Sequence, residues 1–194
     1  DVTVTSEQAR VANGAVSFEG MKATGAGSIQ LADWQPTDAS TIAGSATASG
    51  VDVTHALTAG GYKDVQVTGL LNTTLNFSGT LGQPAASGEV VLSKGLVYRQ
   101  PYDSISSQVR YAKAGPQAAK GTFISGTKRV TFDATYSLPG TMQISAGSNV
   151  MALNQIALVR QRQPDIEGTA QFQGTATLTI GKDGHVNLVK ADGN

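Results

Sequence analysis

The sequence of 194 residues contains no cysteine, only two histidines and few charged side chains. Without cysteine the chain has no disulfides, no thiolate metal ligands and no cysteine nucleophile. Charged residues make up 14% of the chain, against about 25% in a typical soluble domain, and 14 basic residues are balanced by 14 acidic ones. Because the basic residues are scattered singly, the sequence lacks the positive patch that binds a nucleic-acid backbone.

Long hydrophobic runs and aromatic residues are scarce as well. No apolar run reaches the ~18 residues of a membrane-spanning helix. The segment Asp1-Val2-Thr3-Val4-Thr5 has the pattern of a strand and not of a signal peptide, so we expect the chain to be an internal piece of a larger protein. Aromatic residues amount to 6%, with a single Trp, which disfavours a carbohydrate-binding β-sandwich that would rely on exposed rings.

Motifs for catalysis and metal binding are missing. His55 and His185 lie 130 positions apart, and neither has a second ligand at metal-binding spacing. No nucleophile motif of the GxSxG type is present. The segment Gly181-Lys182-Asp183-Gly184 lacks the spacing of a phosphate-binding loop and is better explained as a hairpin turn. We therefore predict that the protein is not an enzyme and uses no cofactor or metal.

Alternation of apolar and polar residues is the dominant signal. It runs over 67–81, 130–138 and 166–180, and it places apolar side chains on one face of a strand and polar ones on the other. A strand of 15 residues is about 50 Å long, far above the usual length of 5–6 residues. Strands of this length are typical of barrels and of large curved sheets.

Glycine interrupts several shorter alternating rows, over 23–31, 42–48 and 88–98. Glycine inside a strand often marks a bend, a bulge or the close approach of another backbone. Simple tolerance of glycine on exposed edge strands is the alternative explanation. The predicted fold class is all-β, with long amphipathic strands in a strongly curved sheet and one or two short helices.

Two segments break the alternation and are predicted as short helices. Residues 52–60 place apolar side chains at helical spacing and end on a glycine pair. Residues 154–163 begin with Asn154 as the expected N-cap and end with arginines before Pro164.

The two predicted helices belong to a weak internal repeat. Each is followed by a short loop, by an apolar–x–Gly step and by a long alternating strand. Val67-Thr68-Gly69 matches Ile166-Glu167-Gly168 at an offset of 99 residues. We therefore expect residues 1–194 to form one elongated segment with a repeat of about 100 residues, seen in 51–100 and 150–194.

Several short motifs stand out in the sequence: Ile29-Gln30-Leu31-Ala32-Asp33-Trp34, the helix entry 49–53 and Val67-x-Gly-Leu-Leu. The most specific is the run over residues 77–92, which has the form "sGTLgqPaasGeV". Together these motifs resemble the TamB/AsmA-like superfamily. The resemblance covers 16–181, and its specificity lies in the order and spacing of the motifs.

This resemblance implies a segment of a periplasmic β-rich rod, folded over like a taco or gutter, in a protein anchored in the bacterial inner membrane. It implies transport of phospholipid between the inner and outer membranes, assembly or secretion of outer-membrane and autotransporter proteins, or both. The implied partners are phospholipid, an unfolded outer-membrane client strand and an outer-membrane assembly factor of the TamA type. No nucleic acid is expected.

The sequence leads to two hypotheses about the apolar rows. In the first they line an open groove in a non-enzymatic conduit or scaffold, and in the second they fill the dry core of a structural or adhesive β-solenoid at the cell surface. Exposure of the rows distinguishes the two. The groove candidates are Leu71, Leu75, Phe77, Val90, Leu92, Val130, Phe132, Tyr136, Ala170, Phe172 and Leu178.

Overall fold

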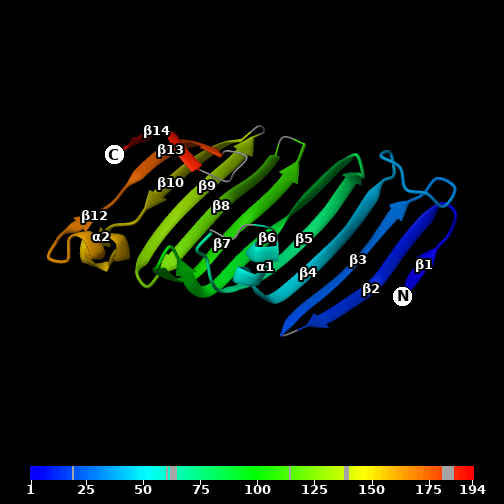
Figure 1. Cartoon of the computed structure of the whole chain (residues 1–194), viewed down its shortest axis with the longest axis horizontal. Coiled ribbons are helices and arrows are strands. Elements are labelled where there is room, and N and C mark those ends of the chain that lie inside the picture. Colours follow the sequence, from blue (N-terminus) through cyan, green and yellow to red (C-terminus); the bar gives the residue numbers. More distant parts are fainter. Residues whose placement is uncertain (19, 60, 62–64, 114, 138–139, 181–185) are drawn as a thin grey trace.

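The all-β prediction is confirmed by a computed structural model, which describes residues 1–18, 20–59, 61, 65–113, 115–137, 140–180 and 186–194. The described part contains one large antiparallel sheet and little helix (Figure 1). Its strands are β1 (Val2–Val4), β2 (Gln8–Phe18), β3 (Met21–Gln30), β4 (Ile42–Asp52), β5 (Leu70–Thr80), β6 (Gln83–Val97), β7 (Gln100–Ala112), β8 (Gly115–Ser125), β9 (Lys128–Ser137), β10 (Thr141–Ser148), β11 (Met151–Ala152), β12 (Thr169–Ala170), β13 (Gln173–Ile180) and β14 (Val186–Gly193).

Twelve of these strands form the large sheet in the order β1 to β10, then β13 and β14. Each strand therefore pairs with its neighbour in sequence, except that β13 follows β10. The two intervening strands, β11 and β12, form a separate two-stranded ladder. Hairpin connections of this kind suit a sequence rich in turn residues. Among the described strands, β1 and β14 lie at the two edges of the sheet.

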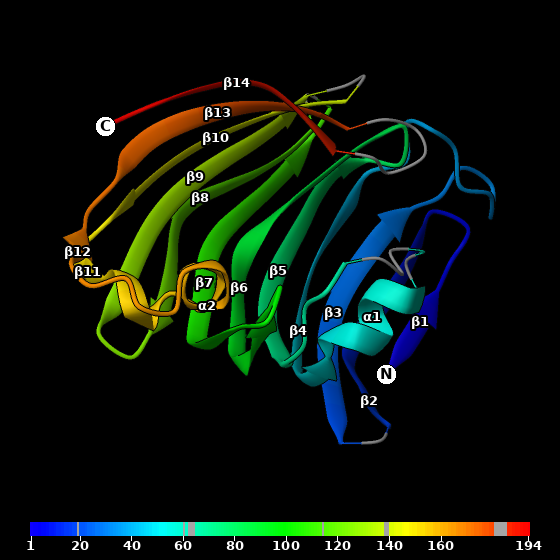
Figure 2. The same ribbon diagram turned by 60° about the vertical axis from the view of Figure 1, so that its left-hand side comes forward.

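The helices sit beside the sheet at one end of the strands. Helix α1 (Val53–Ala59) joins β4 to β5, while the 3₁₀ helix η1 (Leu153–Gln155) and α2 (Ala157–Arg162) lie between β11 and β12. Figure 2 shows α1 and α2 along the same rim of the sheet, which we call the helix rim. The expected N-cap Asn154 is wrong, because η1 includes Asn154 and α2 begins after Ile156.

The predicted strand over 166–180 is also wrong in its extent. Only β12 and β13 are strands there, and Phe172 lies between them. The pairing register changes between β10–β13 and β11–β12. Gly147 of β10 pairs with Gln173, and in the same register Met151 would face Thr169; it pairs instead with Ala170, one residue further along. The strand predicted over 67–81 is also shorter than expected, because β5 begins only at Leu70 and ends at Thr80. The predicted turn at 181–184, His185 and Leu138 lie outside the described residues.

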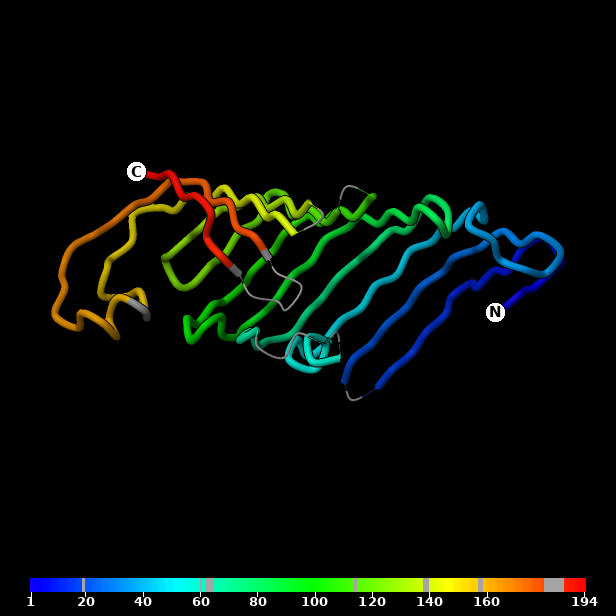
Figure 3. The backbone as a smooth tube through the Cα atoms, turned by 45° about the horizontal axis from the view of Figure 1, so that its top comes forward, coloured from blue at the N-terminus to red at the C-terminus, as the bar shows by residue number. Residues whose placement is uncertain are grey.

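The sheet is arched, as predicted, and Figures 2 and 3 show it curving over from β1 to β14. Close approach of neighbouring backbones accompanies the arch. A Cβ atom on Gly44 would lie 2.6 Å from the carbonyl oxygen of Ala26, and one on Gly88 would overlap the carbonyl oxygen of Thr74. Glycine at these two positions therefore lets adjacent strands come together where a side chain would hold them apart.

This sheet has almost no enclosed core. The accessible surface is 12983 Å² for a chain of 19.9 kDa, about 1.5 times the ~8,700 Å² of a compact monomer of this mass. Among the described residues, the buried hydrophobic side chains are Val53, Tyr102 and Met151. The apolar rows of the sheet are thus covered by little of the protein's own mass.

Candidate functional site: an open apolar face

Strand register brings the apolar rows onto one continuous face. Phe77 of β5 pairs with Gly44 of β4 and Ala86 of β6, and Leu71 pairs with Val51 and Leu92 in the same way. Directly paired residues project from the same side of a sheet, so the rows join from strand to strand. The larger members of this set, which we call the apolar face, are Val2, Val4, Val11, Val16, Phe18, Met21, Ile29, Ile42, Val51, Leu71, Leu75, Phe77, Val90, Leu92, Ile105, Val109, Tyr111, Phe123, Val130, Phe132, Tyr136, Met142, Ile144, Leu178 and Leu188.

The opposite face of the sheet is polar. Asn76 of β5 pairs with Ser45 and Ser87, and Thr135 of β9 pairs with Gln117 and Gln143. Alternation at period two therefore separates the two faces cleanly over most of the sheet.

Nine of the groove candidates lie on the apolar face and are half-buried or more exposed. Phe77 exposes 38% of its surface. The other eight are each half-buried: Leu71, Leu75, Val90, Leu92, Val130, Phe132, Tyr136 and Leu178. A filled core would bury such residues almost completely, so the described face is open.

Few hydrogen-bonding groups on this face are free for a guest. The hydroxyl of Thr73 donates to the carbonyl oxygen of Glu89 at 2.8 Å, and that of Ser107 donates to the carbonyl oxygen of Ala119 at 3.1 Å. Ser148 accepts the backbone N–H of Phe172 at 3.0 Å. These hydroxyls are engaged by the backbone of the protein, which leaves the face chemically close to a hydrocarbon surface.

Two hollows follow the apolar face across the strands. One of about 690 Å³ is lined by residues of β1 to β5, including Val16, Ile29 and Phe77. The other, of about 370 Å³, is lined by residues of β5 to β10, including Leu75, Tyr136 and Met142. Because Leu75 and Phe77 are neighbours on the same face of β5, the two hollows meet at that strand.

A small buried cluster lies at the helix rim. Tyr102 is only 4% exposed, packs against Phe123 with ring centroids 6.2 Å apart and donates its hydroxyl to the carbonyl oxygen of Thr68 at 2.6 Å. Burial raises the pKa of the Tyr102 phenol. No pattern in the sequence points to Tyr102. Its hydroxyl occupies the space that a side chain at Gly69 or at Gly95 would take.

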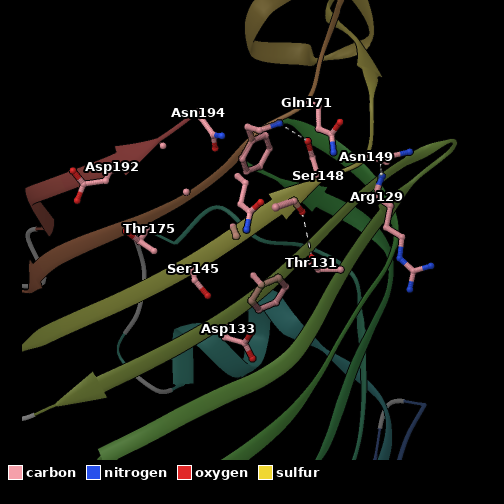
Figure 4. A pocket seen from close by; sticks show the side chains of 17 residues that line it. Arg129, Thr131, Asp133, Ser145, Ser148, Asn149, Gln171, Thr175, Asp192 and Asn194 are labelled. Carbon is pink, nitrogen blue, oxygen red and sulfur yellow. Dashed lines mark hydrogen bonds between the residues drawn. The ribbon is translucent and has the colours of Figure 1, made fainter.

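Two groove candidates are not brought onto the apolar face of the large sheet. Ala170 lies in β12 and pairs with Met151 of β11. Phe172, 41% exposed, lies outside the strands and lines a third hollow of about 950 Å³. Most of the side chains around that hollow are polar, among them Arg129, Asp133 and Asn149 (Figure 4).

The third hollow is larger than the two apolar hollows, but it is a weaker candidate site. Asn149 is already hydrogen-bonded to Arg129 N–H at 2.8 Å and to the Thr127 carbonyl at 2.8 Å, and Asp133 accepts the N–H of Lys120. Its polar side chains thus stabilise the local backbone. The apolar face, by contrast, exposes hydrophobic surface that the described fold does not use.

Other classes of site receive no support in the described part of the chain. Within it, no group of three or more His, Cys, Asp or Glu side chains could hold a metal ion. Nor is any described helix long and apolar enough to cross a membrane. A scan against protein-family models finds no match to this chain, and searches of curated proteins and of solved structures likewise find none.

Proposed function

We propose that this protein is a non-enzymatic conduit segment whose apolar face shelters the acyl chains of phospholipid. The observation that carries the proposal is the exposure of the apolar face, with Phe77 at 38% and its neighbours half-buried. Burying apolar area contributes about 25 cal/mol per Å² to the free energy of binding, whatever the guest. Such a face therefore binds hydrocarbon chains with little dependence on their unsaturation.

Hydrogen bonding favours an acyl chain over an unfolded polypeptide as the guest. The strands between the two edges of the sheet already pair on both sides, so their backbone groups are used. An extended client strand lying on the face would leave its own N–H and C=O groups without partners, at a cost that a hydrocarbon chain does not incur. A role in assembly of outer-membrane proteins would therefore need a different contact from this face.

The competing hypothesis of a solenoid with a filled core has less support. A solenoid stacks repeats so that neighbouring coils bury a continuous core. Here the sheet is a single antiparallel meander, and the described rows remain accessible.

The family resemblance supports a cellular location for this conduit. A lipid conduit of this kind belongs in the periplasm of a bacterium, within a longer protein anchored in the inner membrane. Its far end would meet an outer-membrane assembly factor of the TamA type. The groove would then run across the strands, from β1 toward β14, since the apolar face is continuous in that direction.

The test compares two charged substitutions on adjacent residues of β5. Phe77→Asp places a carboxylate on the apolar face, whereas Ser78→Asp places one on the polar face, where Ser78 is exposed and pairs with Ala85. Binding of a phosphatidylethanolamine that carries a fluorescent acyl chain is titrated for each purified variant. Urea denaturation of both variants checks that they fold.

We expect Phe77→Asp to fold and to lose most of the fluorescent lipid, while Ser78→Asp binds like the unmodified chain. Unfolding of Phe77→Asp would mean that Phe77 belongs to a closed core and would overturn the proposal. Equal lipid binding by both variants, or no binding by the unmodified chain, would overturn it as well.

A further inference from the structure

The two ends of the strands differ in charge. The helix rim consists of the turns β2–β3, β6–β7 and β8–β9, the segments that contain α1 and α2, and the two strand residues on either side of each. Among the described residues, its acidic side chains are Asp52, Asp165 and Glu167, and its basic ones are Lys22, Arg99, Lys128, Arg129, Arg160 and Arg162. At the opposite end of the strands, which we call the far rim, the described turns carry Glu7, Asp33 and Asp38 and a single basic residue, Lys113. The helix rim is therefore the positive end of the described sheet.

The basic side chains of the helix rim are not neutralised within the described fold. The ion pair found in the described part of the chain, Lys190 with Asp192, involves none of them. An acid on the apolar face, Asp103 of β7, lies two residues before Ile105, and its carboxylate accepts the backbone N–H of Gly126 at 2.6 Å. The rim therefore keeps a positive potential that attracts an anionic ligand.

Lys128 brings this charge to the end of the apolar face. It lies two residues before Val130 on β9, so it projects from the same side of the sheet, and it is half-buried. Its Nζ donates a hydrogen bond to the carbonyl oxygen of Gln155 in η1 at 2.9 Å, which fixes the direction of the side chain. An ammonium group carries three N–H donors. In the described chain one of them is used, so two remain for an anion.

The apolar row that begins at Lys128 suits the length of an acyl chain. It continues along β9 through Val130, Phe132 and Ala134 to Tyr136. The stretch from Lys128 to Ala134 covers about 20 Å, at ~3.3 Å per residue. An acyl chain spans about 15 Å, half of the ~30 Å hydrocarbon core of a bilayer. A chain whose phosphate lies at Lys128 therefore ends near Ala134 and Tyr136, which line the hollow of about 370 Å³.

We propose that the helix rim is the headgroup side of the apolar face, where Lys128 binds the phosphate of a phospholipid and the other basic residues favour a headgroup of net negative charge. The inference rests on the proposed function, because it takes the acyl chains to lie on the apolar face. Hydrogen bonds from an ammonium group to phosphate are charge-assisted and strong. A phosphate at the far rim would instead be repelled by Glu7, Asp33 and Asp38.

Two lipids that carry the same fluorescent acyl chain test the proposal. One is phosphatidylglycerol, an anion, and the other is diacylglycerol, which has no phosphate. Lys128→Gln removes the charge and keeps a donor for the Gln155 carbonyl. The affinity for phosphatidylglycerol should therefore fall about fivefold, while the affinity for diacylglycerol stays unchanged. The matched control Lys113→Gln removes one charge at the far rim and should change neither affinity.

A second variant separates charge from structure. The side chains of Arg160 and Arg162 are exposed and make no hydrogen bond or ion pair with the described residues. Arg160→Gln combined with Arg162→Gln should lower the affinity for phosphatidylglycerol about threefold and leave that for diacylglycerol unchanged.

The outcomes distinguish this proposal from the conduit itself. Equal losses of both lipids in Lys128→Gln would mean that Lys128 acts through the fold, and an equal loss in Lys113→Gln would mean that its position is irrelevant. Either result would overturn the headgroup assignment, as would a phosphatidylglycerol affinity that no variant changes, although binding of diacylglycerol would still support the conduit. If the unmodified chain binds neither lipid, both proposals fail.

Paramagnetic labels test the direction of the lipid along the strands. A nitroxide on the headgroup of phosphatidylglycerol should broaden the amide NMR signal of Val130 more than that of Tyr136. A nitroxide at the end of an acyl chain should broaden the signal of Tyr136 more. The reverse pattern would place the phosphate at the far rim, and equal broadening would mean that the lipid has no fixed direction, so either result would contradict the proposal.

Discussion

The backbone N–H of Val53 donates a hydrogen bond to the carbonyl oxygen of Gly69 at 3.1 Å, and so ties the first turn of α1 to the start of β5. Leu153 makes the same bond to Gly168, at 3.0 Å. Both glycines have positive φ, +132° and +126°. The two junctions that match in sequence therefore share one hydrogen bond and one positive-φ glycine, 99 to 100 residues apart. They differ in their helices, because Val53 begins an α-helix and Leu153 begins a 3₁₀ helix.

Alanine substitution of the two glycines should destabilise the protein to different extents. Both Gly69→Ala and Gly168→Ala force a Cβ onto a positive-φ backbone, at a cost of about 1–3 kcal/mol. At Gly69 that Cβ would also lie 2.9 Å from the Ser93 carbonyl oxygen and overlap the Tyr102 hydroxyl, whereas at Gly168 the nearest atom is a Leu153 methyl at 3.8 Å. We expect urea denaturation to show a clearly larger loss for Gly69→Ala, and equal losses would contradict the steric argument.

The Tyr102 hydroxyl should contribute to stability through its bond to the Thr68 carbonyl. Tyr102→Phe keeps the ring contact with Phe123 and removes the 2.6 Å bond, so we expect a loss of about 1 kcal/mol in the free energy of unfolding. Tyr102→Ala removes the ring as well, and should cost about 3–5 kcal/mol. Denaturation of the three proteins at neutral pH measures both effects.

The same phenol predicts a loss of stability at high pH. Burial raises the pKa of Tyr102 in the folded protein above the value of 10.0 that it has when unfolded. The contribution is therefore fully present below pH 10.0 and is lost as the pH rises through the folded pKa. The urea midpoint of the unmodified chain should fall more steeply across this range than that of Tyr102→Phe, and parallel curves would argue against a buried phenol.

Asp52 should make the N-terminus of α1 sensitive to acid. Its carboxylate accepts the backbone N–H of His55 at 3.1 Å, which lowers the pKa of Asp52 below 3.8. The stabilisation is present above the unfolded pKa and is lost as the pH falls through the lower folded value. The amide NMR signal of His55 should report a midpoint below pH 3.8, and Asp52→Asn should remove that titration while keeping the cap.

Sequence patterns predicted the parts of the fold that local periodicity controls. Alternation around Leu75 and Phe132 placed both residues on strands and on one shared face, because the period of two is a property of each strand alone. The break at Ala170 could not be foreseen, since it depends on a one-residue shift between β12 and its distant partner β11. Tyr102 was missed for a similar reason, as its burial results from contacts with Gly69, just before β5, and with Phe123 of β8.

A photo-crosslinking amino acid, placed on either face of the sheet, should show in cells which face contacts phospholipid. Phe77 and Phe132 lie on the apolar face, while the adjacent Asn76 and Thr131 are exposed on the polar face and serve as matched controls. If the apolar face carries acyl chains, crosslinks to phospholipid should form at Phe77 and Phe132 and be absent at Asn76 and Thr131. Capture at all four positions would indicate contact with a membrane surface and not a groove. Capture of polypeptide in place of lipid at Phe77 would mean that the backbone groups of the guest find hydrogen-bond partners elsewhere, because the backbone of β5 already pairs with β4 and β6.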